Sequence, residues 1–209
     1  MPAPQLNKAM STELWNEWNS AGTPNYPHEK VVQFCLRHFP AEVRGQTPTL
    51  DLGCGSGVNS VFLAGENFPV TGVDISTVAI ENSRRFLASL GLSARLFVAP
   101  ADRVDLPSAS FRLVICIGVL DAAGPTIAGG AVAEAARLLD KGGKGMFLFA
   151  SDCDSRILGE NEYRLHGYSR AEVESLFATG FEKVWIDRHI TTFQGGSYES
   201  NNWLVTVQK

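Results

Sequence analysis

Short apolar runs alternate along the chain with stretches that repeat apolar residues every three or four positions. Brief apolar runs bounded by glycine, proline or acidic residues are typical of buried strands. The predicted strands cover residues 49–52, 70–74, 95–99, 111–118, 143–150, 182–192 and 199–208. The last two are expected to form an antiparallel pair, and the run at 111–118 is apolar enough for the centre of a sheet.

Helical periodicity fills most of the intervals between these strands. Ser76 and Ser169 are expected N-caps, and Glu172 completes a capping box with Ser169. The predicted helices cover residues 11–18, 31–39, 76–90, 126–139 and 169–180, and a further helix starts near Val58. This alternation predicts an α/β fold with a doubly wound sheet, which collects ligands at the carboxyl ends of its strands.

A glycine-rich turn separates the first predicted strand from the helix that follows it, with glycines at positions 53, 55 and 57. Glycine allows positive φ and leaves no Cβ between the backbone and a ligand, and a helix start offers free N–H groups. We therefore expect this turn to cradle a cofactor. The dinucleotide fingerprint G-x-G-x-x-G does not fit, because Val58 occupies its third glycine position.

Two carboxylates beside these strands favour a cofactor that carries positive charge. Asp51 stands two residues before the first glycine, where it would repel a pyrophosphate and attract an ammonium or sulfonium group. Asp74 ends the second predicted strand, 19 residues after Gly55 (74 − 55), near the place of a ribose-binding acid in nucleotide folds. A nucleoside with a positively charged end satisfies both acids.

Five motifs in this order resemble those of the class I S-adenosylmethionine (SAM) dependent methyltransferases. They are the segments Leu50–Gly57, Gly72–Asp74, Pro100–Asp102, Phe111–Gly118 and Leu138–Gly143, and the resemblance extends over residues 45–209. The last motif departs from the familiar L-K-P-G-G turn, because Asp140 and Lys141 replace Lys and Pro. The resemblance implies a Rossmann-like, seven-stranded, mostly parallel sheet with an antiparallel last strand and helices on both faces.

The same resemblance implies a site for SAM, with S-adenosylhomocysteine (SAH) as the product. The residues that it assigns to the cofactor are Asp51, Gly53, Cys54, Gly55, Asp74, Ile75, Ala101, Asp102 and Ile117. Asp102 is the candidate acceptor for the adenine amino group, although a carboxylate at this position also fits a simple turn cap. Methyl transfer from a sulfonium is an SN2 displacement that depends mainly on alignment, so no catalytic residue is assigned.

A general base is needed only when the methyl acceptor holds a proton, and the candidates are His28, His166 and Tyr26. Three acids follow predicted strands, at positions from which magnesium-dependent catechol-type methyltransferases draw their ligands, and their oxygens could hold a hard cation: Asp121, Asp152 and Asp154. The Asp-Asn pair of those enzymes is missing, and acids at strand ends commonly cap turns, so no metal is expected.

The length of 209 residues suits one α/β domain, and we expect residues 1–209 to form a single methyltransferase domain. Residues 1–44 are expected to add an N-terminal helical segment. Trp15 and Trp18 lie on one face of its first helix, where they either pack permanently on the domain or form a lid over the cofactor. The long polar segment 151–168 follows a strand at the same edge and is either a functional loop or a mobile surface loop.

Composition limits the classes of binding partner and the cellular location that we expect. The net charge of −4 and the lack of a long basic run argue against a nucleic-acid substrate. No apolar stretch has the length of a membrane span and no signal-peptide pattern occurs, so we expect a soluble, cytoplasmic protein without membrane partners. The four cysteines contain no C-x-x-C pair, which indicates reduced thiols rather than metal ligands.

The methyl acceptor is expected to be a small molecule, and the oligomer a monomer or homodimer. Base-methylating amino-group enzymes carry an N/D-P-P-Y/F motif where this chain has Gly118-Val-Leu-Asp121, which disfavours that class. Similar short chains include tellurite-resistance and thiopurine methyltransferases. Two alternatives are a SAM-binding or nucleoside-binding protein without catalysis and an NAD(P)-binding oxidoreductase, and Asp51 and Val58 count against the second.

Overall fold

The computed structural model describes residues 8–22, 24–159 and 163–209, and side chains from Thr12 onward. The first seven residues of the predicted segment 1–44 lie outside this description, as do residue 23 and residues 160–162 of the polar segment 151–168.

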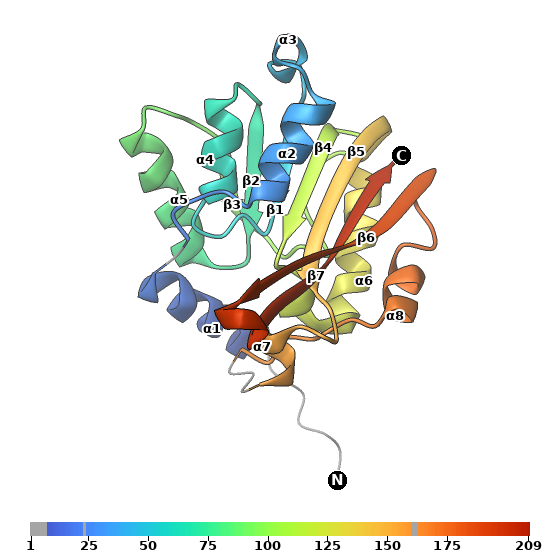
Figure 1. Ribbon diagram of the computed structural model, residues 1–209. Helices are drawn as coiled ribbons and strands as arrows, with labels where there is room; N and C mark the ends of the chain where they lie inside the picture. The colour runs from blue at the N-terminus through green and yellow to red at the C-terminus, as the bar shows by residue number, and fades with distance from the viewer. Residues whose placement is uncertain (1–7, 23, 160–162) are drawn as a thin grey trace.

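A seven-stranded sheet forms the centre of the molecule (Figure 1). Its strands are β1 (Thr49–Leu52), β2 (Val70–Asp74), β3 (Arg95–Val98), β4 (Phe111–Ile117), β5 (Leu139–Ala150), β6 (Lys183–Phe193) and β7 (Tyr198–Gln208). They lie in the order β3-β2-β1-β4-β5-β7-β6. The first five pair in parallel, whereas β7 runs antiparallel to both β5 and β6. The predicted doubly wound sheet with its reversed last strand is confirmed.

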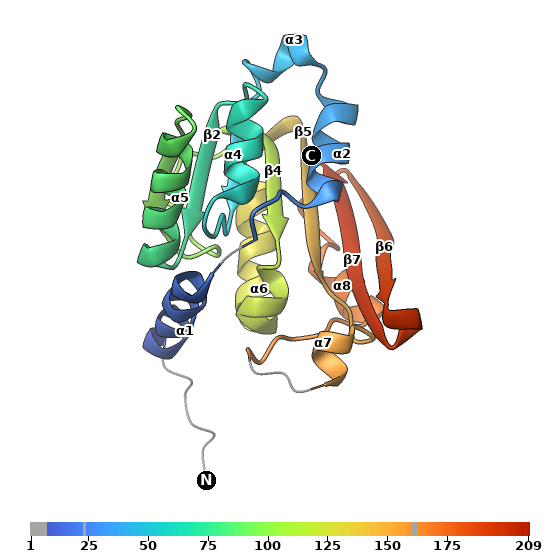
Figure 2. The ribbon, with the colours of Figure 1, turned by 60° about the vertical axis from the view of Figure 1, so that its left-hand side comes forward.

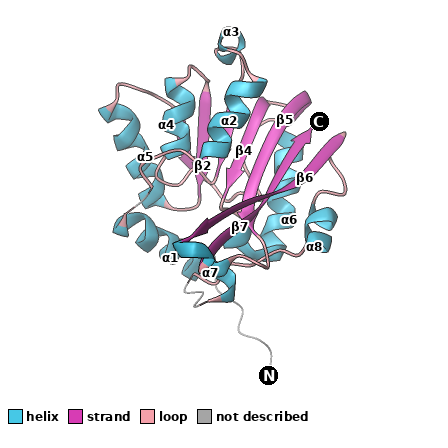
Figure 3. Ribbon diagram, viewed as in Figure 1, coloured by secondary structure: helices cyan, strands magenta, loops and turns pink. Residues whose placement is uncertain are grey.

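Helices cover both faces of the sheet (Figures 2 and 3). They are α1 (Lys8–Ala21), α2 (Glu29–His38), α3 (Ala41–Arg44), α4 (Val58–Gly65), α5 (Thr77–Ser89), α6 (Leu120–Leu138), α7 (Ser155–Leu158) and α8 (Arg170–Leu176), with a 3-10 turn at Gln194–Gly196. Val31 of α2 and Leu63 of α4 belong to one hydrophobic core cluster, whereas Val132 of α6 and Val173 of α8 belong to another. None of the helices described is long and apolar enough to cross a bilayer.

Strands β1 and β4 are buried on both faces, which explains the nearly continuous apolar sequence of β4. Leu50 and Val114 face the core beneath α6, while Leu113 and Ile115 face the core beneath α2 and α4. These two central strands therefore fix the positions of the loops that follow them at the carboxyl edge of the sheet.

Helix α6 begins at Leu120, six residues before the predicted start at 126. Gly124 interrupts it with a φ of 73°, and Pro125 then starts the long helical part. A proline fits the first turn of a helix because it needs no N–H partner there. The interruption explains why the periodicity at 126–139 predicted only the second part.

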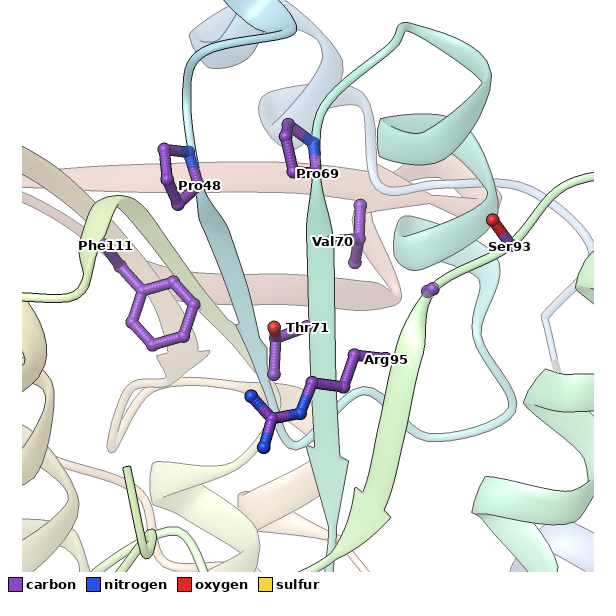
Figure 4. A pocket seen from close by; sticks show the side chains of 8 residues that line it. Pro48, Pro69, Val70, Thr71, Ser93, Arg95 and Phe111 are labelled. Carbon is purple, nitrogen blue, oxygen red and sulfur yellow. The ribbon is translucent and has the colours of Figure 1, made fainter. Parts of the chain in front are cut away.

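A shallow hollow of about 520 Å³ opens at the amino ends of the parallel strands, away from the glycine turn (Figure 4). It is lined by Pro48, Pro69, Val70, Thr71, Ser93, Ala94, Arg95 and Phe111. Doubly wound sheets bind their ligands at the opposite edge, at the carboxyl ends of the strands. The hollow therefore does not lie where a cofactor site is expected.

Gly57 is expected to be sensitive to substitution. It precedes α4 with a φ of 90°, and an added Cβ would lie 2.3 Å from the Ser83 Oγ atom. Gly57→Ala should lower the free energy of unfolding by about 2 to 4 kcal/mol, because overpacking adds to left-handed strain. Urea denaturation measures this loss.

Gly91→Ala is the matched control, because Gly91 has a φ of 68° and no atom within 4 Å of an added Cβ. Its loss should be about 1 to 2 kcal/mol, from strain alone. Equal losses for the two variants would show that the Ser83 side chain moves aside without cost.

Candidate functional site

A cavity of about 650 Å³ opens at the carboxyl edge of the sheet, at the ends of β1, β2 and β4. Eight of the nine residues predicted to bind the cofactor line it: Gly53, Cys54, Gly55, Asp74, Ile75, Ala101, Asp102 and Ile117. Helices α1 and α7 lie at this same end of the sheet (Figure 2). Four segments that are distant in sequence therefore meet at one place.

The glycine turn after β1 adopts the conformation that its sequence predicts. Gly53, Gly55 and Gly57 all have positive φ, at 76°, 53° and 90°. The N–H groups of Gly53 and Cys54 both donate to the carbonyl oxygen of Val73, at 2.8 and 2.9 Å, which ties the turn to β2. No atom lies within 4 Å of a Cβ built on Gly55, so the backbone there is open to the cavity.

Asp74 ends β2 and reaches across to this turn. Its Oδ2 atom accepts the N–H of Gly55 at 2.9 Å, and its Oδ1 atom accepts the N–H of Ser76 at 2.8 Å. Burial raises the pKa of Asp74, and these backbone hydrogen bonds partly oppose the rise. The carboxyl group is therefore fixed in orientation at the wall of the cavity.

Asp51 is the one predicted cofactor residue that does not line the cavity. Its side chain is buried in β1, and its Oδ2 atom accepts the hydroxyl proton of Ser60 at 2.7 Å. Burial raises the pKa of Asp51 to about 7. Any effect of this group on a ligand therefore acts from beneath the glycine turn rather than through an exposed oxygen atom.

Asp102 lies beside α6, because Gly130 of this helix lets the two segments approach closely. An added Cβ on Gly130 would lie 2.8 Å from the Cβ of Asp102. The glycine pair at 129–130 weakens the helical propensity of the sequence. In the structure, Gly130 permits the close approach of α6 and Asp102. Asp102 lines the cavity, as Ala101 and Ile117 do.

The N-terminal helix contacts the cavity through residues that sequence reasoning partly missed. Trp15 and Trp18 line the cavity, as the predicted lid requires, and Trp15 stacks on Tyr163 with ring centroids 6.2 Å apart. Asn16 accepts the hydroxyl proton of Ser76 at 2.6 Å, and Asn19 accepts that of Ser56 at 2.9 Å. Apolar periodicity carries no signal for these two amide contacts.

The candidate base residues lie in different surroundings. Tyr26 and His28 line the cavity, whereas His166 lies outside its lining and contacts Glu172 at 3.0 Å. The His28 Nδ1 atom caps α2 by accepting the N–H of Lys30 at 3.2 Å. Burial lowers the pKa of His28, which favours the neutral ring. No base is assigned.

The polar groups that follow β4 and β5 are engaged with one another. Asp121 lines the cavity and accepts the N–H of Ala150 at 3.0 Å. Asp154 is fully buried and pairs with Arg156 at 2.8 Å. Within the described part of the chain, no three His, Cys, Asp or Glu side chains are grouped so that they could hold a metal ion.

Comparisons with known proteins find similarity to methyltransferases. Residues 49–143 match the family model described as a methyltransferase domain. The chain is 33% identical over 73 residues to an uncharacterized methyltransferase, YodH, of Bacillus subtilis, covering 35% of this chain and 31% of the relative. It is 44% identical over 62 residues to ribosomal RNA small subunit methyltransferase C of Alcanivorax borkumensis, covering 27% and 19%. The chain thus spans about a third or less of these relatives.

Solved structures share the fold over most of the chain. A SAM-dependent methyltransferase of Methanosarcina mazei has a TM-score of 0.66 at 20% identity, covering 78% of this chain and 92% of its own. Magnesium protoporphyrin IX methyltransferase of Synechocystis with bound SAH has a TM-score of 0.68 at 17% identity, covering 99% and 90%. At such identities the likeness concerns the fold.

The buried carboxyl group of Asp51 predicts a specific pH dependence of stability. Its pKa in the folded state is raised to about 7, above its unfolded value, so its contribution to stability is present at low pH and lost as pH rises toward that value. Between pH 5 and 8, wild type should lose about 2 kcal/mol relative to Asp51→Asn.

Urea denaturation of both proteins at the two pH values gives this difference. Both proteins carry the other buried acids, so the contributions of these acids cancel, except that of Asp74, whose charge acts on Asp51. A constant difference between wild type and Asp51→Asn across this range would show that Asp51 stays ionised in the folded state.

Proposed function

We propose that this chain is a class I SAM-dependent methyltransferase and that it transfers a methyl group from SAM to a small-molecule acceptor. The observation that carries the proposal is the convergence of eight predicted cofactor residues from four segments on one cavity. SAM supplies a methyl group on a sulfonium, which is already electrophilic, so the protein has mainly to bind, align and exclude water.

The residues fit this cofactor in chemistry as well as in place. The open backbone over Gly55 gives room for the amino-acid portion of SAM, and the fixed carboxyl group of Asp74 suits the two ribose hydroxyls. Asp102 with Ala101 is assigned to the adenine amino group. Ile75 and Ile117 are assigned to apolar faces of the nucleoside, and the acids together suit a ligand with a positive centre.

The acceptor is assigned to the small-molecule class. A cavity of about 650 Å³ lies in the range of small-ligand pockets, and much of that volume is needed for the cofactor itself. The net charge of −4 disfavours binding to a phosphate backbone. We place the protein in the cytoplasm, because all four cysteines are free thiols.

Direct titration tests the cofactor and a product assay tests the reaction. Wild type should bind SAM and SAH calorimetrically but not NAD or NADP, and SAH should accumulate when small-molecule fractions are supplied with SAM. NAD binding without SAM binding would overturn the cofactor assignment. Tight SAM binding without SAH formation from any fraction would favour a SAM-binding protein without catalysis.

Asp74→Ala should weaken SAH binding by about 2 to 3 kcal/mol, because the ribose hydroxyls lose a fixed acceptor. Calorimetric titration measures the dissociation constant. The variant also loses the acceptor for the Gly55 and Ser76 N–H groups, so its melting temperature must be compared with that of Asp74→Asn, which keeps one acceptor atom. An unchanged dissociation constant in a folded variant would remove Asp74 from the cofactor site.

We propose that α1 closes over the bound cofactor as a lid, because Trp15 and Trp18 line the cavity and the side chains of Asn16 and Asn19 contact Ser76 and Ser56 through polar groups. Hydrogen exchange over residues 11–30 should slow when SAH is added, and deletion of residues 1–24 should reduce turnover more than melting temperature. Equal protection with and without SAH would make this helix a permanent part of the core.

A further inference from the structure

Arg156 differs in charge from the other residues that line the cavity. Among those that the structure describes there, it alone carries a permanent positive charge. It is the second residue of α7, in the segment that follows β5. The proposed cofactor residues lie instead at the ends of β1, β2 and β4 and in the loop after β3.

The guanidinium group is held rigidly from behind. Its Nε atom donates to Oδ1 of Asp154 at 2.8 Å, and its Nη2 atom donates to Oδ2 at 3.0 Å. Asp154 is fully buried and also accepts the N–H of Asn201 at 2.7 Å, which ties it to β7. A side-on pair of this kind fixes the plane of the guanidinium before any ligand binds.

Among the described residues, two donors of the guanidinium remain for a ligand. Nη2 uses its second N–H for Oδ1 of Asn202, at 2.7 Å. Of the five N–H groups of arginine, three are thus engaged, and the remaining two belong to Nη1. Within residues 8–22, 24–159 and 163–209, no acceptor forms a hydrogen bond with Nη1.

We propose that Arg156 binds a carboxylate of the methyl acceptor, which makes the acceptor an organic monoacid with an apolar body. The inference rests on the proposed methyl-transfer function and specifies its substrate class. Preorganised arginine N–H groups favour a carboxylate oxygen over a neutral one. Apolar residues that line the same cavity suit the rest of such a molecule: Val119, Ala122, Ala123, Ile127 and Leu165.

Charge in this part of the cavity limits the acceptor to a single negative charge. Asp154 already balances Arg156, and Asp121 lies in the cavity wall. The N–H groups of Ala150 and Ala122 point at the Asp121 carboxyl group at 3.0 and 3.2 Å and offset part of its charge. The sulfonium of bound SAM adds a positive charge that favours a monoanion, whereas a dianion would face both acids.

Binding to the SAH complex tests the inference without turnover. The probes are cinnamate and octanoate, with cinnamamide and octanamide as uncharged counterparts, titrated into SAH-saturated protein by calorimetry. The acids should bind wild type about tenfold more tightly than the amides. Arg156→Gln should abolish this preference, and Arg156→Lys, which keeps the charge beside Asp154, should reduce it severalfold. Arg170→Gln, at an exposed ion pair with Glu174, controls for net charge.

Any of three results with the acids would overturn the inference: equal binding of acids and amides to wild type, unchanged acid binding in a folded Arg156→Gln, or no binding of either acid at millimolar concentration. A large loss of SAH affinity in folded Arg156→Lys would also overturn it, because the carboxylate held by Arg156 would then be that of the cofactor. If Arg156→Gln does not fold, the test is the preference of Arg156→Lys for acids over amides, which should be reduced severalfold. Failure of the proposed function appears earlier and separately, as wild type that does not bind SAH.

Discussion

The hydrogen bond from the N–H of Gly55 to the carboxyl group of Asp74 joins the ends of two neighbouring parallel strands. Parallel pairing of β1 with β2 brings Leu52 beside Val73, and the glycine turn can reach Asp74 only because its φ angles are positive. Burying this carboxyl group costs free energy, which the backbone N–H groups partly offset. This part of the cavity wall therefore depends on the buried carboxyl group of Asp74, which is stabilised by backbone N–H groups instead of water.

Much of the fold could be predicted from the sequence, because buried parallel strands and amphipathic helices leave strong patterns. The central strand β4 and the capping box at Ser169 and Glu172 follow directly from such patterns. The early start of α6 could not be predicted, since Gly124 and Pro125 read locally as a break. The first turn of α6 depends on the loop after β4 and on the packing of Leu120 in the core. Both are tertiary contacts, which local sequence patterns do not reveal.

The candidate site was predictable where backbone conformation demanded particular residues. Gly53 and Gly55 have positive φ, which glycine adopts most easily, and Asp74 is the last residue of its strand. At these positions the residue type matches the conformation that the site requires. Asn19 and Arg156 were not predicted as cavity residues, because an asparagine in a helix and an arginine in a loop are usual on surfaces. Asp51 was placed correctly in its strand, but burial depth cannot be read from spacing alone.

The cavity is lined by residues from Trp15 to Leu165, and this span has a consequence for the lifetime of the protein. A ligand bound by so many segments is lost when any one of them unfolds, so binding stabilises the whole domain rather than one loop. At a free ligand concentration one hundred times the dissociation constant, the gain is about 2.7 kcal/mol. The cellular supply of SAM and SAH would then help set how often the chain unfolds and meets proteases.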